Sequence, residues 1–452
     1  MKLYRRLLLI LVPGLFACAS AFAQNVDQLA FFQRQVPTAY RYNPAIIGKT
    51  GFLGVGGVSL GTRANVGITT FLYEYGGQTM TALNKSVPVD LFLNKLHPDN
   101  YLVADYRYNL FSYGFFRGDA FHTLELNLRS DAEVTLPKDL FVLLKTGVRK
   151  NTYNFSNARM DSQIYAEIAY GYARKLGDVV SIGARAKLLV GMVSGDARIS
   201  DFHIAWADEG KTSLSFDASM DVTSGQKAKN VGTYLHPEFE PKIPSLSLPS
   251  GTGLTFDLGV LITPGDYLTL SASVADLGFL CWFYKRGGYA NASFSIDDFM
   301  SSYSEDMDWL EIVALGLATY ESMEVSADFK SLKKHARAHL MPFSFDLGLK
   351  YAMPFYDRLS IGLAGHMTHY RRTSYWDTRF AVDLAPLSWL DLTGHLGYGT
   401  YGTNWGVAGS VRIARFRVNF ALYDNFGGTI PHSSKHLKPW NRMLTAGLTY
   451  DL

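Results

Sequence analysis

Apolar and polar residues alternate with a period of two along most of this chain, and this alternation constrains the fold more than any other feature. In Leu254–Ile262 and Phe343–Tyr351, large apolar residues take every second position, and Thr, Ser, Asp, Gly or Lys take most of the positions between. Because successive side chains of a β-strand point to opposite faces, each run predicts a strand with one apolar face. Similar runs recur at residues 124–129, 164–172, 180–188, 268–274, 359–367, 380–384, 390–398, 407–413 and 416–422.

The length of the chain favours one large sheet over several small ones. With weaker runs at residues 52–60, 101–110 and 214–220, we count about 14 strands and expect between ~12 and ~16. A soluble β-sandwich of 452 residues would normally divide into domains joined by linkers, and the sequence contains no evident linker or repeat. Tight turns such as Pro264-Gly265-Asp266 join several pairs of runs, whereas other connections are long. This asymmetry is typical of the periplasmic turns and surface loops of a membrane barrel.

The first residues resemble a targeting segment. Three basic residues precede the apolar run Leu7–Phe16, and Ala21-Phe22-Ala23 offers small residues where a signal peptidase requires them. We therefore expect a signal peptide over residues 1–23.

Charge and cysteine content exclude several classes of protein. Loss of residues 1–23 removes three basic residues and no acidic ones, so the formal net charge falls from +3 to zero. No basic patch remains, and we expect no nucleic-acid partner. Of the two cysteines, only Cys281 remains after the signal, so an intramolecular disulfide is not expected. The apolar stretch Trp309–Tyr320 is too short for a transmembrane helix and contains Glu311, so any membrane crossing must use strands.

The final residues, Asn441–Leu452, alternate in the same way and end within a strand. In a membrane barrel the last strand must pair with the first, because lipid satisfies no open sheet edge. The spacing of Thr445, Gly447, Tyr450 and Leu452 resembles the signal by which barrel-assembly machinery recognises such strands, so this machinery is an expected partner during insertion. The terminal strand of a soluble sandwich is the alternative interpretation.

These features together predict an all-β fold: a single antiparallel transmembrane β-barrel over residues 51–452, in contact with outer-membrane lipid of a Gram-negative bacterium. Short helices are expected at residues 87–96 and 137–145, where the apolar spacing is helical. An insertion is expected near residues 223–251, which are rich in Pro, Gly and Ser. A second is expected near residues 296–339, as either a helical insertion at the barrel mouth or a solvated loop of mixed charge.

An ordered series of short motifs resembles a known family. The series begins at Asn43-Pro44-Ala45 and continues through Gly183–Gly191, Asp257-Leu258-Gly259 and Asp276–Trp282 to Tyr423-Asp424-Asn425. In this order the motifs look like an uncharacterised family of Bacteroidetes outer-membrane β-barrels, classed as a domain of unknown function. The resemblance covers nearly all of the chain after the signal, and it implies no catalytic residue.

The motif Asn43-Pro44-Ala45 is also similar to the start of FadL-type transporters of hydrophobic compounds and of a related barrel that serves type IX secretion. In those barrels an N-terminal segment plugs the lumen. The similarity implies that residues 24–50 form a hatch here, with Asn43, Pro44 and Ala45 within it. A plain periplasmic strap, turned by Pro44 and Gly48, is the alternative.

Charged residues of both signs fall on the face opposite the apolar one, where they would line or fill a lumen. A selective pore usually carries an excess of one sign, whereas a mixed set can pair internally and block the bore. The sequence leaves a packed lumen and an open water channel as alternatives. The residues predicted to face the lumen are Glu125, Arg129, Glu167, Arg185, Lys187, Asp257, Asp346 and Lys350.

No group of residues predicts catalysis or metal binding. His366 and His369 would point to opposite faces of a strand and cannot act together there. His335 and His339 would converge only on a helix, and no third ligand follows from their spacing. We therefore expect neither an enzyme nor a bound metal or cofactor.

Two functions remain for a barrel of this kind. The first is transport of a small hydrophobic molecule, by analogy with FadL-type barrels. The second is a structural or scaffold role in an envelope or secretion complex, with an envelope protein as partner. Fold analogy alone does not decide between them.

Overall fold

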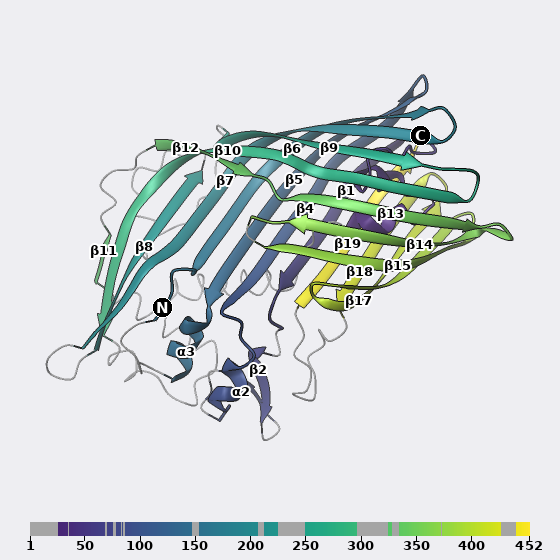
Figure 1. The fold of residues 1–452 in the computed structure, drawn as a ribbon. Helices are drawn as coiled ribbons and strands as arrows, with labels where there is room; N and C mark the ends of the chain where they lie inside the picture. Colours follow the sequence, from purple (N-terminus) through teal and green to yellow (C-terminus); the bar gives the residue numbers. More distant parts are fainter. Residues whose placement is uncertain are drawn as a thin grey trace.

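The computed structural model shows one closed β-barrel (Figure 1). Within the described residues, fourteen antiparallel strands form the wall, which confirms the predicted all-β barrel and its strand number. The structure describes residues 26–34, 36–67, 70–75, 78–82, 84, 86–146, 153–206, 212–224, 249–295, 324–327, 334–371, 373–425 and 440–452.

The wall strands follow one another around the ring in chain order. They are β1 (Phe52–Ala64), β4 (Asp99–Arg117), β5 (Ala120–Pro137), β6 (Arg159–Leu176), β7 (Val180–Trp206), β9 (Gly251–Ile262), β10 (Leu268–Ser295), β13 (Phe343–Met353), β14 (Tyr356–His369), β15 (Ser374–Leu387), β16 (Leu390–Gly399), β17 (Gly402–Ile413), β18 (Phe416–Asn425) and β19 (Trp440–Asp451). The remaining elements are the helices η1 (Val26–Phe31), η2 (Pro37–Arg41), α2 (Val89–Leu93) and α3 (Lys138–Thr146), and the strands β2 (Leu72–Tyr75), β3 (Gln78–Thr81), β8 (Thr212–Ser224), β11 (Glu324–Ala327) and β12 (Lys334–Leu340).

The first and last wall strands close the ring. β1 and β19 pair antiparallel, from Phe52 opposite Asp451 to Ala64 opposite Trp440. Because β19 also pairs with β18, both of its edges are hydrogen-bonded. A sheet without a free edge satisfies the main constraint that lipid places on a spanning structure.

The two faces of the wall differ as the alternation predicts. On the outside, Leu347 is 64% exposed and Leu396 is 58% exposed. Their inward-facing neighbours, Asp346 and His395, are buried. An apolar outer face of this kind is stable only against acyl chains, so the barrel is built to cross a membrane.

The two ends of the barrel also differ. Six connections between wall strands are short turns at one end, on the right of Figure 1, and two of them contain Gly177 and Gly265 at φ values of 69° and 81°. The long connections lie at the opposite end, together with short ones between β14 and β15 and between β16 and β17. In outer-membrane barrels the short turns face the periplasm, so the long connections face the cell exterior.

A small folded cap lies at the end with long connections. It contains β2, β3, α2 and α3, and the rings of Phe71, Phe92 and Phe141 form its core. The helices predicted at residues 87–96 and 137–145 are present as α2 and α3. Burial raises the pKa of the Tyr73 phenol in this cap to about 12.

Two strands, β8 and β9, share the position next to β7 in the sheet. β9 pairs with the first half of β7, and β8 pairs with its second half. β8 ends at Ser224 and β9 begins at Gly251, and an insertion near residues 223–251 is predicted at this place. Residues 225–248 of that insertion lie outside the described part.

The second predicted insertion, near residues 296–339, is described only at β11 and β12, which both pair with β10. Helix and loop were the alternatives for residues 296–339, and the described parts of that stretch are strands instead. Residues 296–323 and 328–333 lie outside the described part. None of the helices in the described residues is both long and apolar enough to cross a membrane.

Candidate functional site: an N-terminal segment inside the barrel

The described residues between 26 and 48, which we call the N-terminal segment, lie inside the barrel near the end with short turns (Figure 1). The segment forms the short helices η1 and η2. Pro37 occupies the first position of η2, where its fixed φ suits a helix and its missing N–H costs nothing. This placement brings Asn43, Pro44 and Ala45, predicted as hatch residues, against the inner wall.

Asn43 ties the segment to two wall strands. Its side-chain amide donates to the carbonyl oxygens of Val260 on β9 and Ala272 on β10, both at 3.1 Å, and to Oγ of Ser271 at 2.8 Å. Its side-chain oxygen accepts from the backbone N–H of Ala45 at 2.8 Å. Asn43 is fully buried, so these bonds replace the water that its amide would otherwise require.

The wall has recesses where the segment touches it. A Cβ atom at Gly183 of β7 would overlap the backbone of Pro44, and one at Gly259 of β9 would overlap the side chain of Asn43. On the far side of the segment, a Cβ at Gly348 of β13 would lie 2.6 Å from the Phe31 ring. Glycine at these positions lets the segment approach the wall backbone closely.

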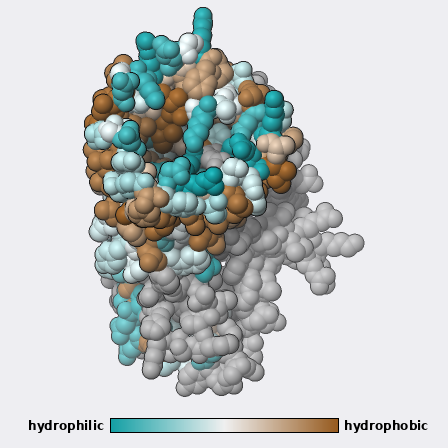
Figure 2. Space-filling view, turned by 90° about the vertical axis from the view of Figure 1, so that its right-hand side faces the viewer, coloured by the Kyte–Doolittle hydropathy of each residue, from teal (hydrophilic) through white to brown (hydrophobic). Residues whose placement is uncertain are grey.

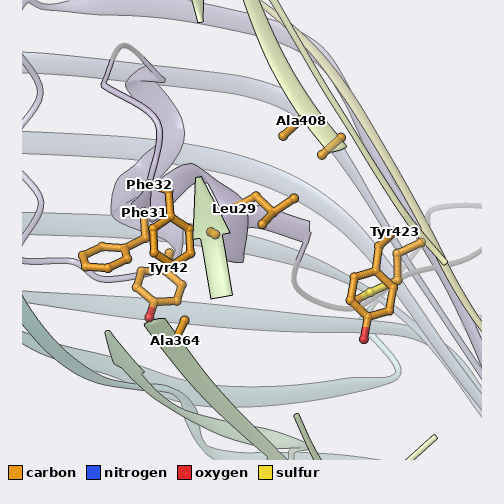
Figure 3. Packing of buried hydrophobic residues seen from close by; sticks show 10 residues of the cluster. Leu29, Phe31, Phe32, Tyr42, Ala364, Ala408 and Tyr423 are labelled. Carbon is orange, nitrogen blue, oxygen red and sulfur yellow. The ribbon is translucent and has the colours of Figure 1, made fainter. Parts of the chain in front are cut away.

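The apolar side chains of the segment pack on one half of the inner wall. Leu29, Phe31 and Phe32 form a cluster with Tyr42, and Figure 3 shows Phe31, Phe32 and Tyr42 gathered beside Ala364. The wall contributes small inward-facing side chains on four strands to this cluster, namely Ala364, Ala381, Ala408 and Ala421. We call this region the alanine wall. Sequence reasoning did not assign it, because alanine marks neither face of an alternating strand.

The other half of the lumen contains a chain of ion pairs. Eight described side chains alternate in sign along it, and each is at least nine-tenths buried. The chain begins at the segment, where Arg41 lies 2.6 Å from Glu125, and Glu125 also pairs with Arg185. In order, its members are Arg41, Glu125, Arg185, Asp257, Lys187, Asp276, Arg129 and Glu167.

The ion-pair chain carries equal numbers of cations and anions. Its separations after Arg185 are 3.0 Å to Asp257, 2.6 Å for both contacts of Lys187, and 3.0 and 2.8 Å for the contacts of Arg129. Buried charges of one sign would each cost several kcal/mol, whereas alternation lets each compensate its neighbours. Of the two alternatives for the lumen, this half is therefore packed rather than an open channel.

Two members of the ion-pair chain, Arg41 and Asp276, were not predicted from the sequence. Arg41 belongs to the N-terminal segment rather than to a strand. Asp276 lies at a register shift between Val274 and Leu277 on β10, so the period of two does not apply to it. Its φ of 61° turns the residue into the lumen, and its N–H donates to Asp257 at 2.8 Å. Aspartate tolerates this conformation better than most residues do.

The remaining predicted lumen residues, Asp346 and Lys350, lie outside the ion-pair chain. Lys350 donates to the carbonyl oxygen of Phe32 in the segment. Asp346 lies 2.7 Å from Nδ1 of His366, whose Nε2 lies 2.7 Å from the hydroxyl of Thr368. These three side chains resemble a catalytic triad in order, and all three are buried. Nε2 of His366 also lies 3.2 Å from the hydroxyl of Tyr375, so the four groups form a buried hydrogen-bonded network.

A second contact spans the lumen above the segment, towards the long connections. Arg63 of β1 pairs with Asp105 of β4 at 2.9 Å, and its guanidinium lies 4.3 Å from the ring centre of Tyr375 on β15. All three side chains are buried. The lumen is therefore filled in two layers, of which only the lower one includes the N-terminal segment.

A cavity of about 570 Å³ lies at the short-turn end, beside the segment. Its apolar lining includes Phe31, Ile46 and Leu261, and its charged lining includes Lys350 and Arg417. Figure 2 views this end of the molecule, where hydrophilic and hydrophobic side chains are interleaved around the mouth. Phe31, which packs in the same cluster as the alanine wall, is among the residues that line this cavity.

Both histidine pairs singled out in the sequence lie on strands. His335 and His339 lie on strand β12, not on a helix, so their spacing of four residues separates them along the strand. His366 and His369 lie on β14, and opposite faces follow from their spacing. Among the described residues, no group of three or more His, Cys, Asp or Glu side chains is arranged to hold a metal ion.

The residues of the predicted assembly signal lie on β19, the strand that closes the ring. Thr445 lies opposite Ser59 of β1, and its hydroxyl donates to Oγ of Ser59 at 3.3 Å. Tyr450 packs its ring against Phe416 of β18, and Leu452 is exposed beyond the end of the strand. Recognition by assembly machinery stays a prediction.

The chain was compared with known proteins and with solved structures. Similar solved structures include the toluene transporter TbuX of Ralstonia pickettii, at a TM-score of 0.45 and 8% identity over 92% of this chain and 94% of that one. The toluene transporter TodX of Pseudomonas putida gives 0.43 and 11% over 92% and 93%, and a FadL homologue of Pseudomonas aeruginosa gives 0.44 and 10% over 95% and 99%.

No curated protein matches the sequence. The model of one protein family matches residues 44–422, a span that contains most of the barrel and begins at Pro44 of the N-terminal segment. The chain therefore belongs to the family of unknown function DUF5723.

Proposed function

We propose that this protein is a channel for a small hydrophobic molecule in the outer membrane of a Gram-negative bacterium, and that the N-terminal segment is its hatch. The alanine wall is the observation that carries the proposal. In a barrel with only a scaffold role, paired polar side chains could fill the lumen on every side. Here four inward-facing alanines form an apolar patch among polar side chains such as Arg379 and Asp383, and Leu29, Phe31 and Phe32 of the segment pack against this patch.

Displacement of the segment would leave the alanine wall without its cover. A hydrophobic molecule can then take the place of Phe31 and Phe32, because it gains the same release of water from apolar surface. The inward-facing alanines give such a molecule room, since larger side chains would fill the space. The cavity beside Phe31 and Ile46 would receive it on the periplasmic side.

The bonds that hold the segment are suited to a reversible latch. Asn43 and Arg41 attach it to the wall through hydrogen bonds and one ion pair, and no disulfide is formed by the described cysteine, Cys281. Water can take over the hydrogen bonds of Asn43 once the lumen opens, whereas release of Arg41 must break its buried ion pair with Glu125.

Uptake of toluene by whole cells tests the channel. Cells that express the protein should accumulate radiolabelled toluene faster than cells without it. Ala408→Asp should slow this uptake strongly, because a hydrophobic molecule would have to pass a carboxylate on the alanine wall. Ala408→Ser, which is nearly the same size, is the matched control and should keep most of the uptake. Equal uptake with and without a correctly folded barrel would overturn the proposal.

A scaffold role in an envelope complex is the second candidate. The neutral ion-pair chain and the Arg63 layer favour it, because both close the lumen. Co-purification of envelope proteins with the detergent-solubilised barrel, together with no toluene uptake, would favour the scaffold over the channel.

A further inference from the structure

A separate cavity of about 200 Å³ lies towards the end with long connections. It is lined by residues from the start of β6, the middle of β7, the strand β12 and the connection that follows β14. Neither the N-terminal segment nor the alanine wall contributes to it. Any role of this cavity is therefore independent of whether the segment opens.

The lining of this cavity is unusually cationic. Asp161 of β6 and Asp196 of β7 lie opposite each other in register, so their carboxylates are neighbours. Four arginines surround them, which leaves an excess of two positive charges when the histidines are neutral. The four are Arg159, Arg198, Arg337 and Arg371.

The ion pairs within the cavity leave part of this charge uncompensated. Arg198 forms a bidentate contact with Asp196, at 2.7 and 2.6 Å. Asp161 serves two guanidiniums at longer distances, 3.4 Å to Arg371 and 4.0 Å to Arg159. One carboxylate therefore serves two arginines, and neither contact has the length of a good charge-assisted hydrogen bond.

Arg159 presents an unpartnered donor at this cavity. Its side chain is 8% exposed, and its Nε has no hydrogen-bond partner among the described residues. An unpaired N–H on a buried guanidinium is costly, because it has lost its water without a replacement. The guanidinium is a rigid fork that fits the oxygens of a carboxylate, phosphate or sulfate.

We propose that this cavity binds a divalent oxyanion that enters from the cell exterior, with Arg159 and Arg371 as its main donors. A negative charge suits this lining, in which the arginines outnumber the aspartates. The volume is large enough for phosphate, sulfate or a small dicarboxylate. The lining aspartates lie on the inward face of the wall, since Met160 beside Asp161 is exposed on the outside, so the anion comes from water rather than from lipid.

Calorimetric titration of the full-length barrel in a non-ionic detergent tests this proposal. Inorganic phosphate, inorganic sulfate and succinate are titrated separately at about pH 8, where histidine is neutral, with chloride at equal ionic strength as the reference. At least one of the three divalent anions should bind saturably, and chloride should not. The three arms distinguish a tetrahedral anion from a dicarboxylate.

Single substitutions locate the site. Arg159→Gln and Arg371→Gln should each weaken binding ~10-fold or more, because each removes a charge-assisted hydrogen bond. Arg174→Gln is the matched control, since Arg174 lies at a short turn with its side chain 51% exposed, and it should leave binding unchanged. Each variant is folded if its gel mobility changes on boiling by the same amount as that of the wild-type barrel. Absence of saturable binding for all three anions, or equal binding by both cavity variants and the wild type, would overturn the proposal.

Discussion

Gly259 of β9 lies directly against the side chain of Asn43, so closely that a Cβ atom there would overlap the Asn43 side-chain oxygen. The same Cβ would lie 2.9 Å from Cδ of Pro44. The wall is therefore shaped to receive this part of the N-terminal segment, and its shape can be changed by a single methyl group.

We predict that Gly259→Ala loosens the segment without unfolding the barrel. The added methyl group pushes Asn43 away from Val260 and Ser271, which breaks its hydrogen bonds. Limited proteolysis of the purified barrel should then cut within residues 26–48 several-fold faster. Gly365→Ala is the control, because a Cβ at Gly365 meets nothing within 4 Å. Equal cleavage rates in both variants would show that the recess at Gly259 does not position the segment.

The ion-pair chain predicts a large cost for removing one charge. In Asp276→Asn the side chain keeps its shape and the residue still tolerates a positive φ, but Arg129 and Lys187 each lose the negative charge that they share. The free energy of unfolding should fall by about 3 kcal/mol or more. Asp119→Asn removes the partner of Arg174 on the surface, where the Asp119 side chain is 89% exposed, and should change stability by less than about 1 kcal/mol. Urea unfolding, followed by the gel mobility of unboiled samples, measures both.

Deletion of residues 24–48 should uncover the alanine wall. Ala381 is fully buried beneath the cluster that Leu29 and Phe32 complete. In a Cys281→Ser background, the variant Ala381→Cys should resist a membrane-impermeant maleimide added from the short-turn side while the segment is present. The deletion should make it react. A cysteine that stays protected after the deletion would mean that other residues cover this wall.

If lipid covers the outer face, the cost of placing a charge on that face should depend on its depth in the membrane. Leu347 lies in the middle of β13 and is 64% exposed, whereas Ile413 ends β17 at a short turn and is 69% exposed. Leu347→Arg should destabilise the folded barrel in liposomes by about 2–4 kcal/mol, and Ile413→Arg by about 1 kcal/mol or less. Equal effects at the two positions would contradict the assignment of lipid to this face.

Much of this architecture follows from the period of two. It assigns Glu125, Arg129, Glu167, Arg185, Lys187 and Asp257 to the inward face, and the structure joins all six in one chain. The period fails at Asp276, because the register shift on β10 adds residues that no alternation reveals.

Other features depend on contacts between distant parts of the chain. Arg41 meets Glu125 only because the segment folds back into the barrel, and nothing local to Arg41 encodes that contact. The alanine wall is visible only when four strands are placed side by side, since a single inward-facing alanine is unremarkable in any of them. The Arg159 cavity likewise combines residues from four separate parts of the chain.

A disulfide between the segment and the wall tests the central claim most directly. Asn43 and Ser271 are in hydrogen-bond contact at 2.8 Å, so Asn43→Cys with Ser271→Cys, in a Cys281→Ser background, should cross-link on oxidation. Cross-linked cells should take up toluene no faster than cells without the protein, and a reductant should restore uptake, while each single cysteine variant should be unaffected by oxidant. Uptake at the full rate through a completely cross-linked barrel would contradict the account, because the segment would then not be the hatch.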